Sequence, residues 1–373
     1  MKRYLPNLAV LSALAFAVPL LAAPLGLPTV PVPPNNPQTP EKIKLGDKLF
    51  HDTRFSATGE VSCATCHDKD KAFTDHLRVS EGINKLTGTR NAPTVINAVY
   101  LNTQFWDGRE PTLEAQSAQP FLNPIEMGLS DHKPILKIVR SDSDYVRAFK
   151  KVFGKSASEV TMTEVKQAIA SFERSIVSAD SPFDRYLFGA DKDAMTAAQI
   201  RGLAVFLAQG RCVSCHAIEQ TQAMFTDNRF HNLGIGFKRI RGQVSVVADE
   251  FLKSKRAGLD VDHTVLSQQN MSELGRFAIT ENLTEVGAFK TATLRNIAVT
   301  APYMHDGSLK TLEDVVDFYN NGGRLKETDP VDDFQSGGIK PLNLTDQQKA
   351  DLVEFMKALT SPEYQHIARK IQK

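Results

Sequence analysis

The sequence predicts a mainly α-helical protein with two domains, and three observations lead to this fold class. Five segments place apolar residues at helical spacing, and most of them have a threonine that can cap the helix. Alternation of apolar and polar residues, which is typical of strands, is scarce. One pentapeptide, Cys-x-x-Cys-His, occurs once in each half of the chain, and 373 residues are enough for two domains that each bury a core.

The helices are expected where a capping signal precedes an apolar face. Thr196 and Thr345 each have a glutamine three residues later, which is the spacing of a capping box, and Thr163 is a further candidate N-cap. Two consecutive glycines follow the fourth segment, as is typical beyond a helix C-terminus. These signals predict helices over residues 41–50, 163–177, 196–210, 311–320 and 345–359.

The N-terminus has the features of a targeting segment. Lys2 and Arg3 precede an apolar stretch from about residue 8 to 21, which ends in two alanines. A membrane anchor is the alternative, but about 14 apolar residues fall short of the ~20 that span a bilayer. We therefore expect residues 1–23 to be a cleaved signal peptide, and the mature protein to lie in the periplasm without a membrane span. Seven prolines in residues 24–40 predict an extended, partly disordered linker.

The charge balance excludes one class of partner. Lys and Arg number 44 and Asp and Glu number 43, a formal net charge of +1, so the chain has no basic excess for binding nucleic acid. Residues 235–285 include a charged stretch for which we expect a solvated face, with a partner contact as the alternative. Its charged residues are Asp249, Glu250, Lys253, Lys255 and Arg256.

The two pentapeptides predict covalent c-type haems. Two thiols separated by two residues can add to the two vinyl groups of a haem, and the adjacent histidine can ligate the iron. A redox Cys-x-x-Cys would need no following histidine, and the two pairs lie too far apart for a typical zinc site. The residues are Cys63, Cys66 and His67 for haem 1, and Cys212, Cys215 and His216 for haem 2. All four cysteines of the chain are thus assigned to thioether bonds rather than to disulfides.

Further motifs carry a family resemblance. Residues 90–94 read Arg-Asn-Ala-Pro-Thr and 105–109 read Phe-Trp-Asp-Gly-Arg. Residues 123–127 read Asn-Pro-Ile-Glu-Met, and 300–307 read Thr-Ala-Pro-Tyr-Met-His-Asp-Gly. In this order, these motifs resemble those of the bacterial di-haem cytochrome c peroxidase and MauG superfamily. The resemblance implies two cytochrome c-like domains with one covalent haem each.

The resemblance also implies a division of labour between the domains. Residues 41–190 would form an N-terminal peroxidatic haem domain, and residues 191–373 a C-terminal electron-transfer haem domain. Glu126 would be the acid/base over haem 1, since a carboxyl can move the proton that H₂O₂ cleavage requires. Gln116 and Pro120 match positions in the same distal pocket, and Trp106 matches the relay between the haems.

The ligand opposite His216 would distinguish the two branches of the superfamily. The resemblance places Tyr319 at this position, where MauG-like proteins have a tyrosine and the peroxidases proper a methionine. Met304 is the competing candidate. Tyr319 shares a helix face with Leu312 and Val316, so it points inward in either case. His76, in the loop after haem 1, does not fall where the peroxidases have a capping histidine, and we expect the iron of haem 1 to be open.

The resemblance implies one further cofactor and a function. Asn97, Thr300 and Pro302 match a calcium site between the domains, and their oxygens suit Ca²⁺. The leading hypothesis is a periplasmic MauG-like enzyme that uses H₂O₂ to form high-valent haem iron and oxidises a partner protein, as in Trp modification. The alternative is a di-haem cytochrome c peroxidase that reduces H₂O₂ to water with electrons from a small cytochrome c or cupredoxin. A third hypothesis, an electron carrier with two saturated haems, is disfavoured by an open iron beside Glu126.

Overall fold

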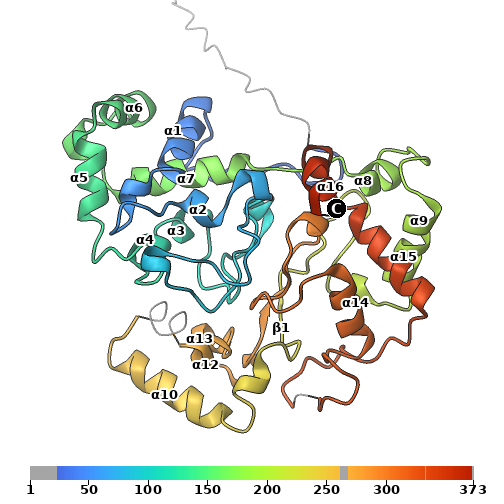
Figure 1. Cartoon of the computed structure of the whole chain (residues 1–373). Helices are drawn as coiled ribbons and strands as arrows, with labels where there is room; N and C mark the ends of the chain where they lie inside the picture. Colours follow the sequence, from blue (N-terminus) through green and yellow to red (C-terminus); the bar gives the residue numbers. More distant parts are fainter. Residues whose placement is uncertain (1–22, 261–267, 332, 372–373) are drawn as a thin grey trace, which may run out of the picture.

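The computed structural model describes residues 23–260, 268–331 and 333–371, and this part of the chain is mainly helical (Figure 1). The predicted signal peptide lies outside the described residues except for Ala23. Helices α1–α7 gather in an N-terminal half, and α8, α9 and α14–α16 in a C-terminal half. Within the described ranges, no helix is both long and apolar enough to cross a membrane. The mainly α-helical fold class is confirmed.

The helices of the N-terminal half are α1 Pro40–Phe50, α2 Cys63–Cys66, α3 Leu113–Gln116, α4 Gln119–Leu122, α5 Lys133–Ser141, α6 Ser143–Phe153 and α7 Met162–Ser175. Those that follow are α8 Pro182–Leu187, α9 Ala197–Leu207, α10 Val244–Arg256, α12 Gln269–Ser272, α13 Phe277–Thr280, α14 Leu312–Asn320, α15 Asp346–Lys357 and α16 Gln365–Ile371. The sheet of the described residues pairs β1 Phe230–His231 with β2 Phe289–Lys290, antiparallel.

All five predicted helices are present, with small shifts at their ends. Thr196 and Thr345 close the expected capping boxes at α9 and α15. The N-cap of α7 is Thr161 rather than Thr163, because Thr161 closes a capping box with Glu164. The N-cap therefore lies two residues earlier than predicted, and the helix begins at Met162.

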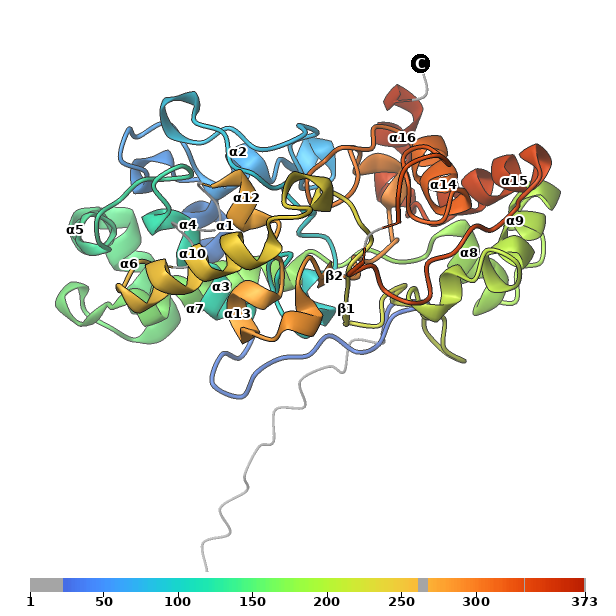
Figure 2. The same ribbon diagram turned by 90° about the horizontal axis from the view of Figure 1, so that it is seen from below.

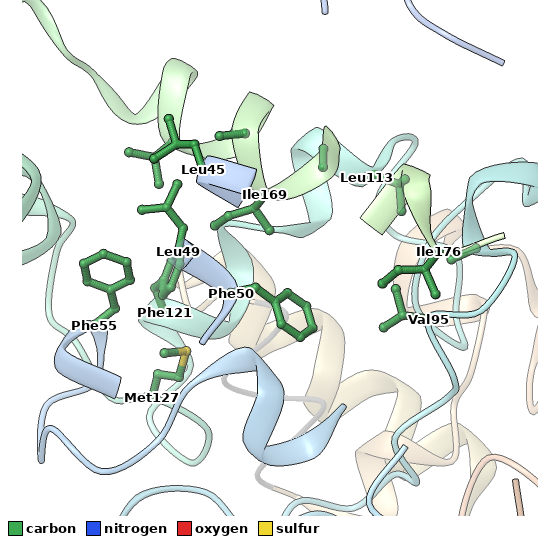
Figure 3. Close-up of a cluster of buried hydrophobic side chains, with 14 of the residues drawn as sticks. Leu45, Leu49, Phe50, Phe55, Val95, Leu113, Phe121, Met127, Ile169 and Ile176 are labelled. Atoms are coloured by element: carbon green, nitrogen blue, oxygen red, sulfur yellow. The ribbon is translucent and has the colours of Figure 1, made fainter. Parts of the chain in front are cut away.

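The first and last helices of the N-terminal half cross at van der Waals contact. A Cβ atom on Gly46 of α1 would lie 1.9 Å from the Ala168 carbonyl oxygen of α7, so the crossing needs a glycine. Leu45, Leu49 and Ile169 bury their side chains around this point, as Figure 3 shows. The close crossing thus fixes the core of this half, and the haem motif follows directly after α1.

The C-terminal half repeats this crossing. A Cβ on Gly202 of α9 would lie 1.9 Å from the Asp351 carbonyl oxygen of α15. The other residue that it would meet is Phe355, through its Cβ, just as a Cβ on Gly46 would meet the Cβ of Phe172. Gly46 and Gly202 therefore occupy equivalent places in two cytochrome c-like frames. The two halves therefore resemble each other in the packing of these helix pairs.

A separate lobe is inserted in the second half of the sequence. Residues 235–290 contain α10, α12 and α13 with a small core of their own, which includes Phe251 and Phe277. The lobe lies against the N-terminal half (Figure 1), where Arg276 donates to the carbonyl oxygens of Asp107 and Gly108 at 2.9 and 2.8 Å. The charged residues of α10 lie on a helix that buries its other face in this core.

The proline-rich segment differs from its prediction. Residues 24–39 are extended, as expected, but they pack along both halves (Figure 2) instead of being partly disordered. Asn36 is 1% exposed and donates to Glu114 in the N-terminal half at 2.7 Å. The Gly26 carbonyl accepts from Arg295 in the C-terminal half at 2.6 Å. Side-chain and backbone partners on both halves therefore hold the segment, which we call the strap.

The two glycine crossings generate a testable prediction. In a free helix, Gly→Ala stabilises by about 1 kcal/mol, but Gly46→Ala and Gly202→Ala are each expected to destabilise by about 1–3 kcal/mol, because the added methyl meets a backbone carbonyl. Chemical denaturation of the haem-loaded protein measures the difference. The control is Gly88→Ala, where an added Cβ meets nothing within 4 Å; destabilisation equal to that of the control would contradict the account.

Candidate haem sites

Both histidines of the pentapeptides are oriented by a backbone carbonyl. His67 Nδ1 lies 3.2 Å from the Phe73 carbonyl oxygen, and His216 Nδ1 lies 2.8 Å from that of Phe225. A carbonyl oxygen can only accept, so each Nδ1 carries the proton and each Nε2 has its lone pair free for iron. Burial lowers the pKa of both imidazoles, which keeps them in the neutral form that a metal needs.

Matching threonine contacts brace the two haem frames. Thr74 donates to the Ala92 carbonyl oxygen at 3.0 Å, and Thr226 donates to that of Thr291 at 2.6 Å. The same pairing recurs in reverse, from Thr94 to Ala72 and from Thr293 to Met224. Each motif is thereby tied to a segment later in its own half. The four cysteines are free thiols in the structure, and their thioether role stays a prediction.

A cavity of about 510 Å³ lies in front of the second pentapeptide. Its wall includes Cys212, Cys215 and His216, together with apolar side chains of α9, α14 and α15. Among the described residues, no Asp or Glu lines it, whereas the basic side chains Arg211, His231, Lys290, His305 and Lys340 do. An apolar pocket with basic groups and no acids suits a haem, whose ring is apolar and whose two propionates are anionic. The residues present therefore fit haem 2.

Tyr319 and Met304 both line this cavity. Burial and the neighbouring Cys212 and Cys215 sulfurs raise the pKa of Tyr319, which places its phenol close to the sulfurs that would hold the haem. Met304 directly follows Tyr303 in a loop that the Tyr303–Leu309 bridge closes. The Gln104–Glu110 bridge closes the matching loop of the other half, so the equivalent of Met304 is Phe105. Both have positive φ, 73° and 64°. Met304 is thus a wall residue of a repeated loop, and Tyr319 is the stronger ligand candidate.

The structure brings Glu126 to the haem 1 motif. Burial, together with the charge of Glu126, raises the pKa of the Cys66 thiol to about 12, so the carboxyl is near the sulfur that would hold haem 1. The Asn123 side chain accepts from the Glu126 N–H at 3.2 Å, and the Glu126 carbonyl accepts from Ile83 N at 3.0 Å. A Cβ on Gly82 would lie 1.9 Å from the Ile125 carbonyl oxygen, so only glycine allows this loop to approach.

Gln116 and Pro120 lie on consecutive short helices that lead to Glu126. Gln116 is the last residue of α3, and Pro120 stands in the first turn of α4. Both helices pack on the N-terminal core through Leu113 and Phe121, which are buried. Their role in a distal pocket stays a prediction.

His76 is held away by the other half. Its Nε2 lies 2.9 Å from the Val299 carbonyl oxygen of the C-terminal half, and the residue has a left-handed backbone with φ 61°. A nitrogen engaged with this carbonyl is not available to iron in this conformation. The geometry accords with the expectation that His76 leaves haem 1 open.

Trp106 lines the haem 2 cavity, next to a backbone hydrogen bond between the two halves. Its indole N–H donates to the Asn91 carbonyl at 2.9 Å, and the Asn91 N–H donates to the His305 carbonyl at 2.8 Å. The Trp106 carbonyl accepts from Lys290 N at 2.8 Å. The Trp106 indole is thus fixed by the backbone of its own half and the Trp106 carbonyl by residue 290, while the relay role stays a prediction.

The predicted calcium ligands are not all in one place. Thr300 and Pro302 line the cavity, but Asn97 does not. Asn97 is fully buried and exchanges hydrogen bonds with the Ser178 backbone, from Nδ2 to the carbonyl at 2.8 Å and to Oδ1 from the N–H at 2.9 Å. Asn91 is the asparagine that lines the cavity with Thr300 and Pro302. The assignment of Asn97, Thr300 and Pro302 to a calcium site stays a prediction, and Asn91 is a further amide beside the last two.

Two groups at the sites escaped the sequence analysis. Lys290 is buried in the cavity wall and donates to the Thr103 carbonyl at 2.6 Å; burial lowers its pKa to about 8. Cys215, Asp227 and His231 bring three ligand atoms within 4.8 Å of one another. A thioether sulfur at Cys215 would be a poor metal ligand, so this trio belongs to the haem 2 cradle rather than to a separate metal site.

Comparisons with known proteins agree with this geometry. The profile of a family described as di-haem cytochrome c peroxidase matches residues 40–192. The cytochrome-c peroxidase IdrP1 of Pseudomonas sp. (strain SCT) is 36% identical over 343 residues, which cover 90% of this chain and 85% of that protein. The methylamine utilization protein MauG of Methylorubrum extorquens is 34% identical over 331 residues, covering 89% and 81%.

A solved structure supports the same assignment. The crystal structure of a MauG-like protein associated with microbial copper homeostasis aligns with a TM-score of 0.75 and 34% identity, covering 92% of this chain and 95% of that chain. The likenesses thus extend through both haem motifs and over most of the chain. The protein therefore belongs to the di-haem cytochrome c peroxidase and MauG family of haem-dependent oxidoreductases, a membership that implies two haem c groups.

Proposed function

We propose that the protein is a periplasmic enzyme of the MauG type, which uses H₂O₂ to oxidise a partner protein. The observation that carries the proposal is the position of Tyr319, close to both Cys212 and Cys215 in the haem 2 cavity. A phenolate ligand favours higher iron oxidation states, whereas methionine raises the potential. The MauG-like structural relative adds support through its identity of 34%.

The chain's own residues supply positioning and proton transfer. When bound, the haem irons would supply the redox chemistry, in which H₂O₂ is the oxidant. Cys63, Cys66 and His67 would hold haem 1, and Glu126 would move a proton between the two peroxide oxygens. Trp106 would conduct oxidising equivalents to haem 2, held by Cys212, Cys215 and His216. Gln116 and Pro120 would shape the distal pocket.

The partner and the calcium ion belong to the same proposal. The partner would be a periplasmic protein that offers an oxidisable aromatic side chain, of which tryptophan is the most easily modified example. A calcium ion would bind where Thr300 and Pro302 meet the cavity wall, with Asn91 as the amide donor in place of Asn97. It would stiffen the junction of the two halves beside Trp106.

The second candidate is a di-haem cytochrome c peroxidase that reduces H₂O₂ with electrons from a small redox protein. Met304 in the haem 2 cavity favours it, since a thioether there would give a high-potential electron entry site. The relative IdrP1 is named as such a peroxidase.

Spectroscopy of the ferric protein separates the two candidates. We expect one high-spin and one low-spin haem in the EPR spectrum, and optical changes on adding H₂O₂ without prior reduction, because an uncapped haem 1 is part of the proposal. Two low-spin haems that react with peroxide only after reduction would contradict the MauG-type proposal.

The sixth ligand is tested by Tyr319→Phe. Loss of the phenolate is expected to abolish or shift the low-spin EPR signal while both haems stay attached. The control is Tyr303→Phe, which removes a hydroxyl from the same cavity wall; Tyr303 donates to the Ile297 carbonyl at 3.0 Å. An unchanged spectrum in Tyr319→Phe, or an equal change in the control, would assign the ligand elsewhere.

Glu126→Gln tests the acid/base. It removes the proton carrier but keeps the shape, so the rate of the optical change with H₂O₂ is expected to fall by roughly 10²–10⁴-fold in stopped-flow measurements. Glu60→Gln, an exposed carboxyl in the same half, is the control and should leave the rate unchanged. A Glu126→Gln rate within threefold of the control would remove Glu126 from the mechanism.

A further inference from the structure

Glu173 is a buried carboxyl that the proposed mechanism does not use. It lies on α7, is 6% exposed, and its Oε2 has no hydrogen-bond partner. An unpartnered carboxyl oxygen in a protein interior is costly unless the group is neutral or faces a ligand. Its place in the fold indicates which ligand that would be.

The internal repeat places Glu173 in the wall of the haem 1 pocket. The glycine crossings pair Ala168 with Asp351 and Phe172 with Phe355. One residue further along each helix, Glu173 is the equivalent of Met356, which lines the haem 2 cavity. An acid therefore stands near haem 1 where a thioether stands near haem 2.

The electrostatics around Cys63 agree with this placement. Burial raises the pKa of the Cys63 thiol, and among the nearby charges that of Glu173 raises it most. The Glu173 carboxyl therefore lies near the sulfur that would attach haem 1. This contact is independent of the comparison between the two halves.

The other charged groups leave Glu173 without a dedicated partner. Glu114 of α3 faces it, but this carboxylate accepts from Arg174 at 2.7 Å and from Asn36. Lys42 of α1 is turned to the Asn36 oxygen and the Pro37 carbonyl. Burial and repulsion from Glu114 raise the pKa of Glu173 to about 8, although Arg174 opposes the shift.

We propose that Glu173 is a positioning residue that sets the reduction potential of haem 1 through its own charge state. As a neutral acid it adds no charge to the pocket. As a carboxylate it stabilises the more oxidised iron, because a negative charge beside the haem opposes the arrival of an electron. Reduction of the iron by one electron would also raise the affinity of Glu173 for a proton. At a pH between the pKa values of Glu173 in the oxidised and the reduced protein, the electron would be accompanied by up to one proton from solvent, which converts the carboxylate to the acid; above both values the carboxylate would stay ionised.

The test is a redox titration of both haems in the wild type and in Glu173→Gln. At pH 6 the haem potentials of the two proteins are expected to agree, since the carboxyl of Glu173 in the wild type and the amide of the variant are both neutral there. At pH 9.5 the Fe(III)/Fe(II) equilibrium of one haem should favour Fe(III) on the order of tenfold more in the wild type than in the variant. A unit negative charge roughly 10 Å from the iron has an effect of this size at an effective dielectric constant of about 20. The other haem should not differ.

Two further variants sharpen the result. Glu173→Met copies the wall of the haem 2 cavity and should behave as Glu173→Gln does. Glu126→Gln removes the other carboxyl near haem 1 and should keep the alkaline change that depends on Glu173. Potentials that differ equally at both pH values, or that change with pH in Glu173→Gln as in the wild type, would overturn the proposal.

A stability measurement without redox chemistry gives an independent readout. The folded-state pKa of Glu173 lies above that of the unfolded chain, so the folded state binds the extra proton between these values. The free energy of unfolding should therefore fall as pH rises from 5 to 8 in the wild type, and fall less in Glu173→Gln. Equal pH profiles would count against a buried ionisable group. The inference rests on haem 1 binding as proposed, but neither measurement needs peroxide turnover, so it can fail or hold separately from the proposed function.

Discussion

The structure depends on one steric constraint, the contact of a helix glycine with a backbone carbonyl of a second helix, which occurs between α1 and α7 in one half and between α9 and α15 in the other. Gly46 against Ala168, and Gly202 against Asp351, bring two helix axes together without intervening side chains. The crossing sets which residues of the last helix face the haem. The haem motif follows the first helix of each pair, so its cysteines and histidine are delivered to the same wall. The axial histidine, its carbonyl partner and the bracing threonines then take equivalent places in both halves.

The differences between the two repeated frames carry the function. Equivalent positions hold Phe105 and Met304, Trp106 and His305, and Glu173 and Met356. The same scaffold thus occurs twice. In the N-terminal half, carboxyl groups lie near the cysteines predicted to hold haem 1, whereas no carboxyl group of the described residues lines the haem 2 cavity. Acid groups suit proton transfer, and a pocket without acids suits electron storage. The halves meet where Trp106, Asn91 and His305 are linked through backbone hydrogen bonds.

The features that the sequence predicted are those that depend on residues close together in the chain. The pentapeptides, the capping threonines and the inward face of Tyr319 each depend on residues within a few positions, so the haem motifs and five helices followed from the sequence. The hydrogen bonds of Asn97 could not be predicted, because its partner Ser178 lies 81 residues away in the sequence. The burial of Glu173 arises from helix packing, and a lone glutamate gives no sequence signal for it. The packing repeat could not be predicted from the sequence, because the acceptors in its shared contacts are backbone carbonyl oxygens, which every residue type provides.

The strap has a consequence for the order in which the molecule forms. Its partners Asn36–Glu114 and Gly26–Arg295 join residues 78 and 269 positions apart, so the second contact cannot exist until the C-terminal half has folded. Contacts of such long range form late, because the loop they close is large. Arg295 also pairs with Asp184 at 2.8 Å, an ion pair buried beneath the strap. We therefore expect the strap to dock after the local helices of both halves have formed, and the strap to be more accessible to a protease before that step than after it.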